Sequence, residues 1–131
     1  MKRLLLLAAA AAAAVLVFSA VGGAKSGTVV HVVEHATTDA TTDTGKKGDS
    51  AGDILTFAND VFDQADKRKA GTDNGFCIRT VAGKAYECRW TTFLAKGQIT
   101  VGGPFYDTSN SILAITGGTA AYAGAPAAGW S

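Results

Sequence analysis

The stretch from Gly71 to Leu94, GTDNGFCIRTVAGKAYECRWTTFL, decides the fold of this chain. β-Branched and aromatic residues flank a turn at residues 81–84, a pattern typical of a β-hairpin. The two cysteines of the chain, Cys77 and Cys88, lie at equal distances from the centre of that turn. A short loop of about two to four residues fits this register. The hairpin then places the two sulfur atoms opposite each other on one face, within reach of a disulfide.

The hairpin has no purely apolar face. Arg79 shares one face with Cys77 and Trp90, and the opposite face carries Glu87 and Arg89. A sandwich would show a cleaner alternation of apolar and polar residues. A small barrel with a partly polar lumen, packed externally against another subunit, accounts better for this mixture.

The composition suits one small domain. The chain has 131 residues, of which 47% are hydrophobic, and its formal net charge is +1. A charge so close to zero argues against a nucleic-acid partner, because phosphate binding needs a clustered basic face. The densest basic cluster, Lys-Arg-Lys at residues 67–69, is interpreted as the solvated tip of a loop.

Residues 1–24 have the pattern of a secretory signal peptide. Lys2 and Arg3 precede a largely apolar run at residues 4–21. The small residues Gly22-Gly23-Ala24 then offer a cleavage site. The alternative is a retained membrane anchor, but the run is short for a span and rich in alanine. We therefore expect a secreted protein that has no stable membrane association after cleavage, in a compartment that favours disulfides.

Residues 25–51 are expected to hold the first strand and a flexible loop. Residues 28–34 (TVVHVVE) include four valines, and β-branched residues favour a strand. Residues 36–52 repeat Thr and Asp and contain no apolar side chain larger than alanine, so we expect a mobile loop. On a strand, His31 and His35 lie too far apart to share one metal ion and are expected to face solvent. No metal site is expected.

Residues 52–131 are expected to form the main domain. Further strands are predicted at residues 54–62, 98–101 and 111–116, with the second of these interrupted by Gly102-Gly103-Pro104. No amphipathic helical window of useful length follows the leader. The sequence therefore predicts an all-β antiparallel meander of about six strands.

Several motifs in this domain occur in a particular order. They are Gly52-Asp53 with Phe57 and Asn59; Lys67-Arg68 with Gly71 and Gly75-Phe76-Cys77; Tyr86-Glu87; Gly97-Gln98-Ile99-Thr100-Val101 with Gly103-Pro104-Phe105; Leu113-Ala114-Ile115-Thr116-Gly117-Gly118; and Tyr122-Ala123-Gly124-Ala125. The ordered set resembles the allene oxide cyclase family and its dirigent-like barrel superfamily, and is similar to a secreted bacterial member. No single motif is diagnostic.

The resemblance implies an antiparallel barrel of about eight strands, usually a trimer, with a hydrophobic cavity. The plant cyclases of the family turn an unstable fatty-acid allene oxide into a cyclopentenone, and dirigent relatives steer phenoxy-radical coupling. No cofactor is expected. Its members continue for about two strands beyond the point where this chain ends at Ser131, so the barrel is expected to be incomplete at its C-terminus.

The resemblance also implies a site. Asn59 matches a cavity asparagine that supplies hydrogen bonds, and Cys77 matches a cavity cysteine near the substrate. Glu34 matches an acidic residue of the first strand that assists charge delocalisation. We therefore expect Asn59 and Glu34 as catalytic residues, and Asn59, Cys77, Phe105 and Trp90 as ligand-binding residues.

This chain departs from the family at several polar positions. The asparagine that follows the acidic residue is Ala36, the cavity tyrosine is Phe105, and a Ser-Pro pair that holds a water has no counterpart. A cyclase must stabilise an oxyanion as the epoxide opens, and these groups would do so. The losses favour a protein that binds or orients an apolar oxygenated small molecule, in the manner of dirigent proteins.

An isomerase of the cyclase type and a vestigial structural domain remain the alternatives, so the sequence leaves open whether the protein is an enzyme. A polar constellation in the lumen around Asn59 would favour an enzyme. An apolar lumen would favour a binding protein.

The leader is expected to be removed after Ala24. N-terminal sequencing of exported material checks this, and should read Lys25 as the first residue. An intact Met1 in a membrane fraction would contradict cleavage and would support the anchor.

Overall fold

The computed structural model describes residues 29–124 and 129–130. The proposed leader, residues 1–24, lies outside the described residues, so its cleavage stays a prediction. In the part of the chain that is described, no helix is long and apolar enough to cross a membrane.

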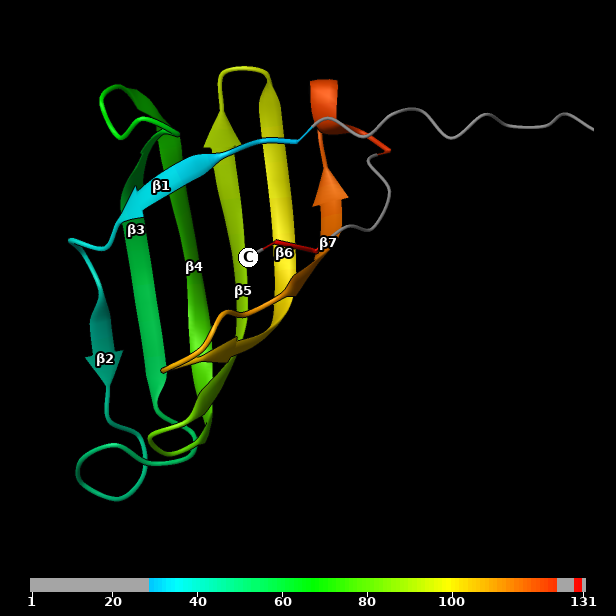
Figure 1. The fold of residues 1–131 in the computed structure, drawn as a ribbon. Helices are drawn as coiled ribbons and strands as arrows, with labels where there is room; N and C mark the ends of the chain where they lie inside the picture. The colour runs from blue at the N-terminus through cyan, green and yellow to red at the C-terminus, as the bar shows by residue number, and fades with distance from the viewer. Residues whose placement is uncertain (1–28, 125–128, 131) are drawn as a thin grey trace, which may run out of the picture.

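The described residues form a single antiparallel sheet of eight strands with one short 3₁₀ turn (Figure 1). Seven strands follow one another in the order β1-β3-β4-β5-β6-β7-β8, and β2 also pairs with β3. The strands are β1 Val32–His35, β2 Ala40–Thr42, β3 Ile54–Asp63, β4 Lys69–Val81, β5 Ala85–Leu94, β6 Gly97–Tyr106, β7 Leu113–Gly118 and β8 Gly129–Trp130; the 3₁₀ turn is Ala120–Tyr122. The all-β antiparallel prediction is confirmed.

The sheet curls strongly, so that one face is concave and the other convex (Figure 1). Figure 1 shows β1 crossing the concave side at one end of the long strands, and Val30, just before β1, packs against the core. Among the described residues no pairing joins β1 to β8, so the ladder does not close there. Within the described residues the strands therefore do not form a closed ladder.

The β4–β5 hairpin has the predicted register. Cys77 lies directly opposite Cys88, and the two form a disulfide with a Cα–Cα distance of 4.0 Å. The strand pairing is irregular next to the turn. Arg79 pairs with Tyr86, but the next pair is Val81 with Ala85, so the register shifts by one residue between them. Gly83 within this turn has a φ of +65°, a conformation that glycine adopts without a steric penalty.

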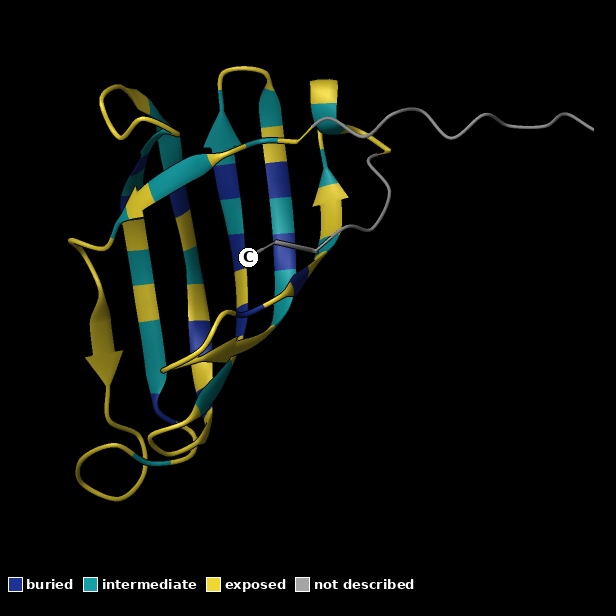
Figure 2. Ribbon diagram, in the orientation of Figure 1, coloured by how far each residue is buried: buried dark blue, intermediate teal, exposed yellow. Residues whose placement is uncertain are grey.

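Buried residues alternate with more exposed ones along β4, β5 and β6, where Figure 2 shows dark bands. The buried apolar residues form one cluster: Cys77, Cys88, Trp90, Ile99, Val101 and Leu113. Other buried residues are polar, among them Asn59, Asp73, Arg79 and Thr92. The predicted partly polar lumen is confirmed, and the convex face leaves Phe76 and Ile78 exposed.

The predicted interruption of the sixth strand is wrong. β6 runs from Gly97 to Tyr106 and passes through Gly102, Gly103 and Pro104 without a break. Pro104 pairs with Glu87 on β5, beyond the last residue of β6 that pairs with β7. A proline is tolerated at such a position because one side of the strand has no ladder to interrupt.

Two strands were missed by the sequence reasoning, β2 within the Thr/Asp-rich segment and the short β8. The segment lacks large side chains, and polar contacts hold it instead. The carboxylate of Asp53 accepts hydrogen bonds from the backbone N–H groups of Ser50 and Thr44, which lower the pKa of Asp53. β2 itself pairs with the start of β3.

Arg79, on the hairpin, forms ion pairs with acidic residues of two loops. Its guanidinium lies 2.7 Å from the carboxylate of Asp49 and 2.7 Å from that of Asp107, and its centre is 3.6 Å from the ring centroid of Tyr86. The side chain of Arg79 is almost fully buried, and a buried cation needs such partners. At the other end of the sheet, His31 is exposed and the His35 side chain is 42% exposed, as the sequence predicts, and His35 also stacks on Phe62 and bonds to Asp66.

Replacing both cysteines, as Cys77→Ala with Cys88→Ala, is expected to lower the free energy of unfolding by about 2–3 kcal/mol, because a short closed loop is released in the unfolded chain. Urea denaturation measures the change. Reductant should destabilise the natural chain to a similar degree and leave the double variant unaffected. Two titratable thiols in the untreated, denatured protein would contradict the disulfide.

Candidate functional site

A buried amide organises the polar end of the concave face. The side chain of Asn59 on β3 is fully buried. Its Oδ1 accepts hydrogen bonds from the N–H groups of Thr37 and Thr38 at 3.1 and 2.9 Å, and from the Thr38 hydroxyl at 2.8 Å. Its Nδ2 donates to Glu34 Oε1 at 2.7 Å and to Asp39 Oδ1 at 2.8 Å. Every hydrogen-bonding position of this amide is therefore occupied.

Strand alternation and one tight turn bring these residues together. Glu34 on β1 lies opposite Val61, an inward-facing residue of β3, so its side chain shares the concave face with Asn59. After β1 the chain turns, with the N–H of Thr37 bonded to the carbonyl of His35 at 2.8 Å. This turn carries Asp39 back to Asn59, and two carboxylates meet at one amide.

A third carboxyl group lies beneath this pair. Asp73 on β4 is directly opposite Asn59 on one side and Thr92 on the other, and its side chain is 2% exposed. Burial, together with the nearby charge of Glu34, raises the pKa of Asp73 from 3.8 to about 7. The Asp73 Oδ1 and the Thr92 hydroxyl find no hydrogen-bond partner among the described residues. Asp73 can therefore exchange a proton close to neutral pH.

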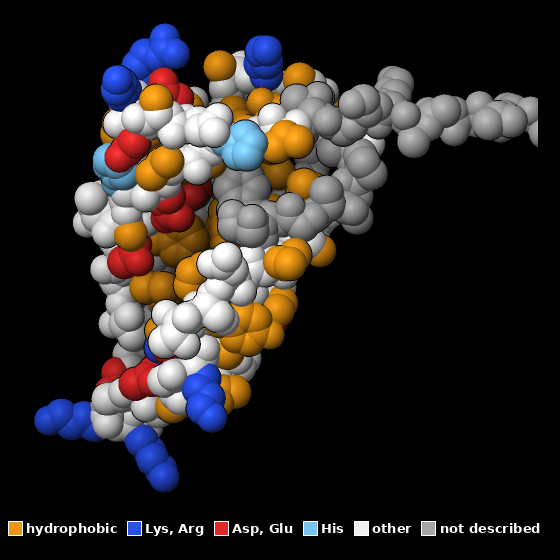
Figure 3. Space-filling model, viewed as in Figure 1, with side chains coloured by type: hydrophobic (Ala, Val, Ile, Leu, Met, Phe, Trp, Pro, Cys, Tyr) orange, Lys and Arg blue, Asp and Glu red, His pale blue; other side chains and the backbone are white. Residues whose placement is uncertain are grey.

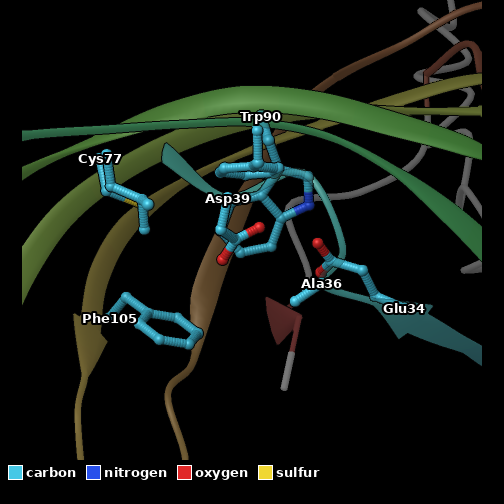
Figure 4. Close-up of a pocket in the computed structure, with 8 residues that line it drawn as sticks. Glu34, Ala36, Asp39, Cys77, Trp90 and Phe105 are labelled. Atoms are coloured by element: carbon cyan, nitrogen blue, oxygen red, sulfur yellow. The ribbon is translucent and has the colours of Figure 1, made fainter. Parts of the chain in front are cut away.

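An apolar hollow of about 140 Å³ adjoins these carboxylates. Figure 3, which looks onto this side, shows acidic side chains beside a hollow with hydrophobic walls. Figure 4 shows the Glu34 carboxylate turned toward the indole of Trp90, with Phe105 and Cys77 across the hollow from Glu34. The lining residues are Glu34, Ala36, Asp39, Leu55, Phe57, Cys77, Trp90 and Phe105.

The floor of the hollow depends on a glycine. Trp90 lies opposite Gly75 in the β4–β5 ladder, and a Cβ added to Gly75 would come within 2.4 Å of the Trp90 Cβ. Only glycine leaves room there for the indole to lie over the sheet. The ring of Phe57 meets Trp90 edge-on at a centroid distance of 6.2 Å, which fixes the aromatic floor.

A second hollow of about 260 Å³ continues from the first and shares Glu34, Trp90 and Phe105 with it. Its further lining residues are Ser109, Asn110, Ser111 and Leu113. The two together form a groove with an aromatic floor and one acidic end. The described residues contain no group of three or more His, Cys, Asp and Glu side chains arranged to hold a metal ion.

The structure brings most of the predicted site residues together. Glu34, Cys77, Trp90 and Phe105 all line the hollow. Asn59 lies behind it, where its amide holds the carboxylates and has no donor left for a ligand. Cys77 lines the hollow as half of a disulfide, so it presents no thiol.

Other residues of the site were not predicted. Leu55 and Phe57 share the inward face of β3 with Asn59, and their alternation could have revealed them. Asp73 lies four residues before Cys77 on the same face, which the hairpin register also implied. Asp39 had no such signal, because the low-complexity segment around it gives no register.

Comparisons with known proteins agree with this fold. The family model described as allene oxide cyclase matches residues 30–129. Among solved structures, the chain is similar to one described as pyocyanin demethylase, with a TM-score of 0.60 and 30% sequence identity over 70% of this chain and 76% of that one. A comparison with curated proteins finds no match.

The substitution Asp73→Asn is expected to stabilise the protein in alkaline solution. Between pH 3.8 and about pH 7 the folded state holds the Asp73 proton and the unfolded chain has lost it, so stability falls as the pH rises through this window. The side-chain amide introduced by Asp73→Asn does not ionise, so the variant does not lose stability as the pH rises. We expect a gain of about 1–3 kcal/mol near pH 8 that shrinks toward zero near pH 4.

Urea denaturation at both pH values measures this gain. The control is Glu87→Gln, which removes the same charge from an exposed position on β5 and should change stability little at either pH. A loss of stability of equal size at both pH values in the Asp73→Asn variant would contradict the raised pKa.

Proposed function

Since this chain belongs to the allene oxide cyclase family, we propose that its groove binds and orients an apolar, oxygenated small molecule, in the manner of dirigent proteins. The observation that carries the proposal is the aromatic hollow of about 140 Å³ with Glu34 and Asp39 at one end. Apolar walls supply affinity through burial, and a few polar groups fix the orientation of the ligand. A ligand hydroxyl would donate a hydrogen bond to either carboxylate.

The solved structure with 30% identity supports a small-molecule function. Its description, pyocyanin demethylase, is that of an enzyme acting on a small molecule. For this chain we propose only that the same fold binds a small molecule. We do not propose that it catalyses demethylation.

A second candidate is an isomerase of the cyclase type that acts on the same ligand. The observation that favours it is the polar cluster around Asn59, in which Asp73 has a pKa of about 7. A group that titrates near neutral pH suits general acid–base chemistry. In this reading Glu34 faces the ligand, and Asn59 acts as a positioning residue through its hydrogen bond to Glu34.

We also propose that the protein is exported and that it assembles with copies of itself. Export to an oxidising compartment is supported by the Cys77–Cys88 disulfide. Assembly with copies of the same chain is supported by the exposed side chains of Phe76 and Ile78 on the convex face, which are 44% and 42% exposed.

A substitution that fills the groove tests whether the ligand binds there. Ala36 lines the hollow, so Ala36→Phe should weaken the binding of 1-naphthol by about tenfold or more, because the new ring occupies the space of the ligand. Isothermal titration calorimetry measures the affinity. The matched control is Ala58→Phe, which places the same ring at an exposed position of β3 beside Asn59 and should leave binding unchanged. Equal affinities in all three proteins would locate binding elsewhere.

No enantioselective cyclisation of a fatty-acid allene oxide is expected. Ala36 and Phe105 stand where the family pattern has an asparagine and a tyrosine, and each lost oxyanion donor costs about 2.7–4 kcal/mol of barrier in comparable sites. Chiral chromatography of the cyclopentenone should find a racemic product, since the substrate also cyclises spontaneously. An enriched enantiomer would instead favour the isomerase.

A further inference from the structure

We propose that Cys77 is a thiol-exchange site, at which a small apolar thiol that enters the aromatic hollow attacks the Cys77–Cys88 disulfide. The inference goes beyond the proposed binding function, because it concerns a covalent reaction of the protein itself, and it requires only that the hollow admits a small molecule. It draws on the position of Cys77 in the wall of the hollow, on the direction of the sulfur–sulfur bond and on the packing around Cys88.

Of the two bonded cysteines, Cys77 is the one that adjoins the hollow. It is one of the residues that line the hollow of about 140 Å³, whereas Cys88 is not among the described residues that line either part of the groove. Figure 4 shows the side chain of Cys77 at the edge of the hollow, on the same side as Phe105. Both cysteines are otherwise buried, at 3% exposed each. In the folded protein, a reagent therefore reaches the disulfide through the hollow and at Cys77.

The sulfur–sulfur bond has the orientation that such an attack requires. A thiol attacks one sulfur of a disulfide along the bond axis, on the side opposite the sulfur that leaves. Cys77 and Cys88 are directly opposite each other in the β4–β5 ladder, so the bond runs across these two strands. Continued beyond Cys77, this line leads toward β3, where Leu55 is the partner of Cys77. Leu55 also lines the hollow, so the hollow lies on the side from which Cys77 can be attacked.

The corresponding approach to Cys88 is filled by the core. Beyond Cys88 the same line leads to Gly103, its partner on β6. Gly103 has no side chain, and a Cβ placed there would lie 3.8 Å from the Cβ of Leu113. Leu113 is 1% exposed and belongs to the same buried cluster as Cys88. Attack at Cys77 is therefore expected to be faster than attack at Cys88.

The lining of the hollow selects which thiols react. Apolar walls favour a thiol that carries an aromatic ring over one with polar substituents, because the ring leaves water when it enters. A volume of about 140 Å³ is close to that of a cavity that holds benzene. The carboxylates of Glu34 and Asp39 also line the hollow and disfavour an anionic thiol such as glutathione.

The reaction exchanges one disulfide for another. The sulfur of the incoming thiol forms a bond to Cys77 Sγ while the bond between Cys77 Sγ and Cys88 Sγ breaks, and the electron pair of that bond passes to Cys88. Cys88 ends as a free thiol, with a proton in place of the one that the incoming thiol has lost. No external oxidant is needed, since the mixed disulfide at Cys77 replaces the original disulfide.

The test compares phenylmethanethiol, which is apolar, with 2-mercaptoethanol, a polar thiol of similar acidity, on the natural chain at neutral pH. Each rate is divided by the rate of the same thiol with oxidised glutathione, and N-ethylmaleimide traps the cysteine that is released. We expect a normalised rate about tenfold or more higher for phenylmethanethiol. Peptide mapping by mass spectrometry should find the benzylthio group on Cys77 and the maleimide on Cys88.

Blocking the hollow should remove this preference. Saturating 1-naphthol and, separately, Ala36→Phe should each slow the reaction of phenylmethanethiol by about tenfold, because both occupy the route to Cys77. The matched control is Ala58→Phe, which places the same ring at an exposed position and should leave the rate unchanged.

Equal normalised rates for the two thiols, or a benzylthio group found on both cysteines, would show that the hairpin opens to solvent before it reacts and would overturn the proposal. A folded protein that does not react with phenylmethanethiol would overturn it as well. If Ala36→Phe slows the reaction but 1-naphthol neither binds nor protects, the exchange site stands and the proposed binding function fails. If 1-naphthol binds and the rates are equal, the binding function stands and this inference fails.

Discussion

The register of the β4–β5 hairpin is the constraint on which the rest of this molecule depends. Side chains alternate between the two faces of a strand, so a slip of one residue would move every inward side chain to the convex face. In the observed register Cys77 meets Cys88 and Gly75 lies under Trp90. The disulfide fixes this register covalently, and both the apolar core and the floor of the groove follow from it.

The buried side-chain amide of Asn59 gives a defined conformation to a segment whose composition is typical of a flexible loop. Residues 36–52 have no apolar side chain larger than alanine, yet the turn before β2 is held at Asn59 by three donors from Thr37 and Thr38. A buried amide left without partners would cost several kcal/mol, at roughly 1–3 kcal/mol for each unsatisfied group. Satisfying Asn59 therefore brings Glu34 and Asp39 to the groove.

The sequence predicted what depends on local pattern and missed what depends on long-range contacts. Cys77 and Cys88 are symmetric about a turn, and Trp90 follows by alternation, so their common face could be read directly. The place of Asp39 depends on a contact with Asn59 across 20 residues of chain, and no periodicity encodes that contact. Likewise, the glycines and proline of β6 looked like a break because the sequence does not reveal where the ladder with β7 ends.

The shortness of β1 has a consequence for how the groove is entered. This strand of four residues carries Glu34 and, within the described part of the chain, pairs with β3 alone, whereas β4 pairs along both of its edges. Local opening needs less free energy where fewer contacts must be broken, so β1 detaches more readily than a strand of the hairpin. When β1 is detached, the groove loses the carboxylate of Glu34. The affinity measured for any ligand is therefore scaled by the fraction of molecules in which β1 is docked.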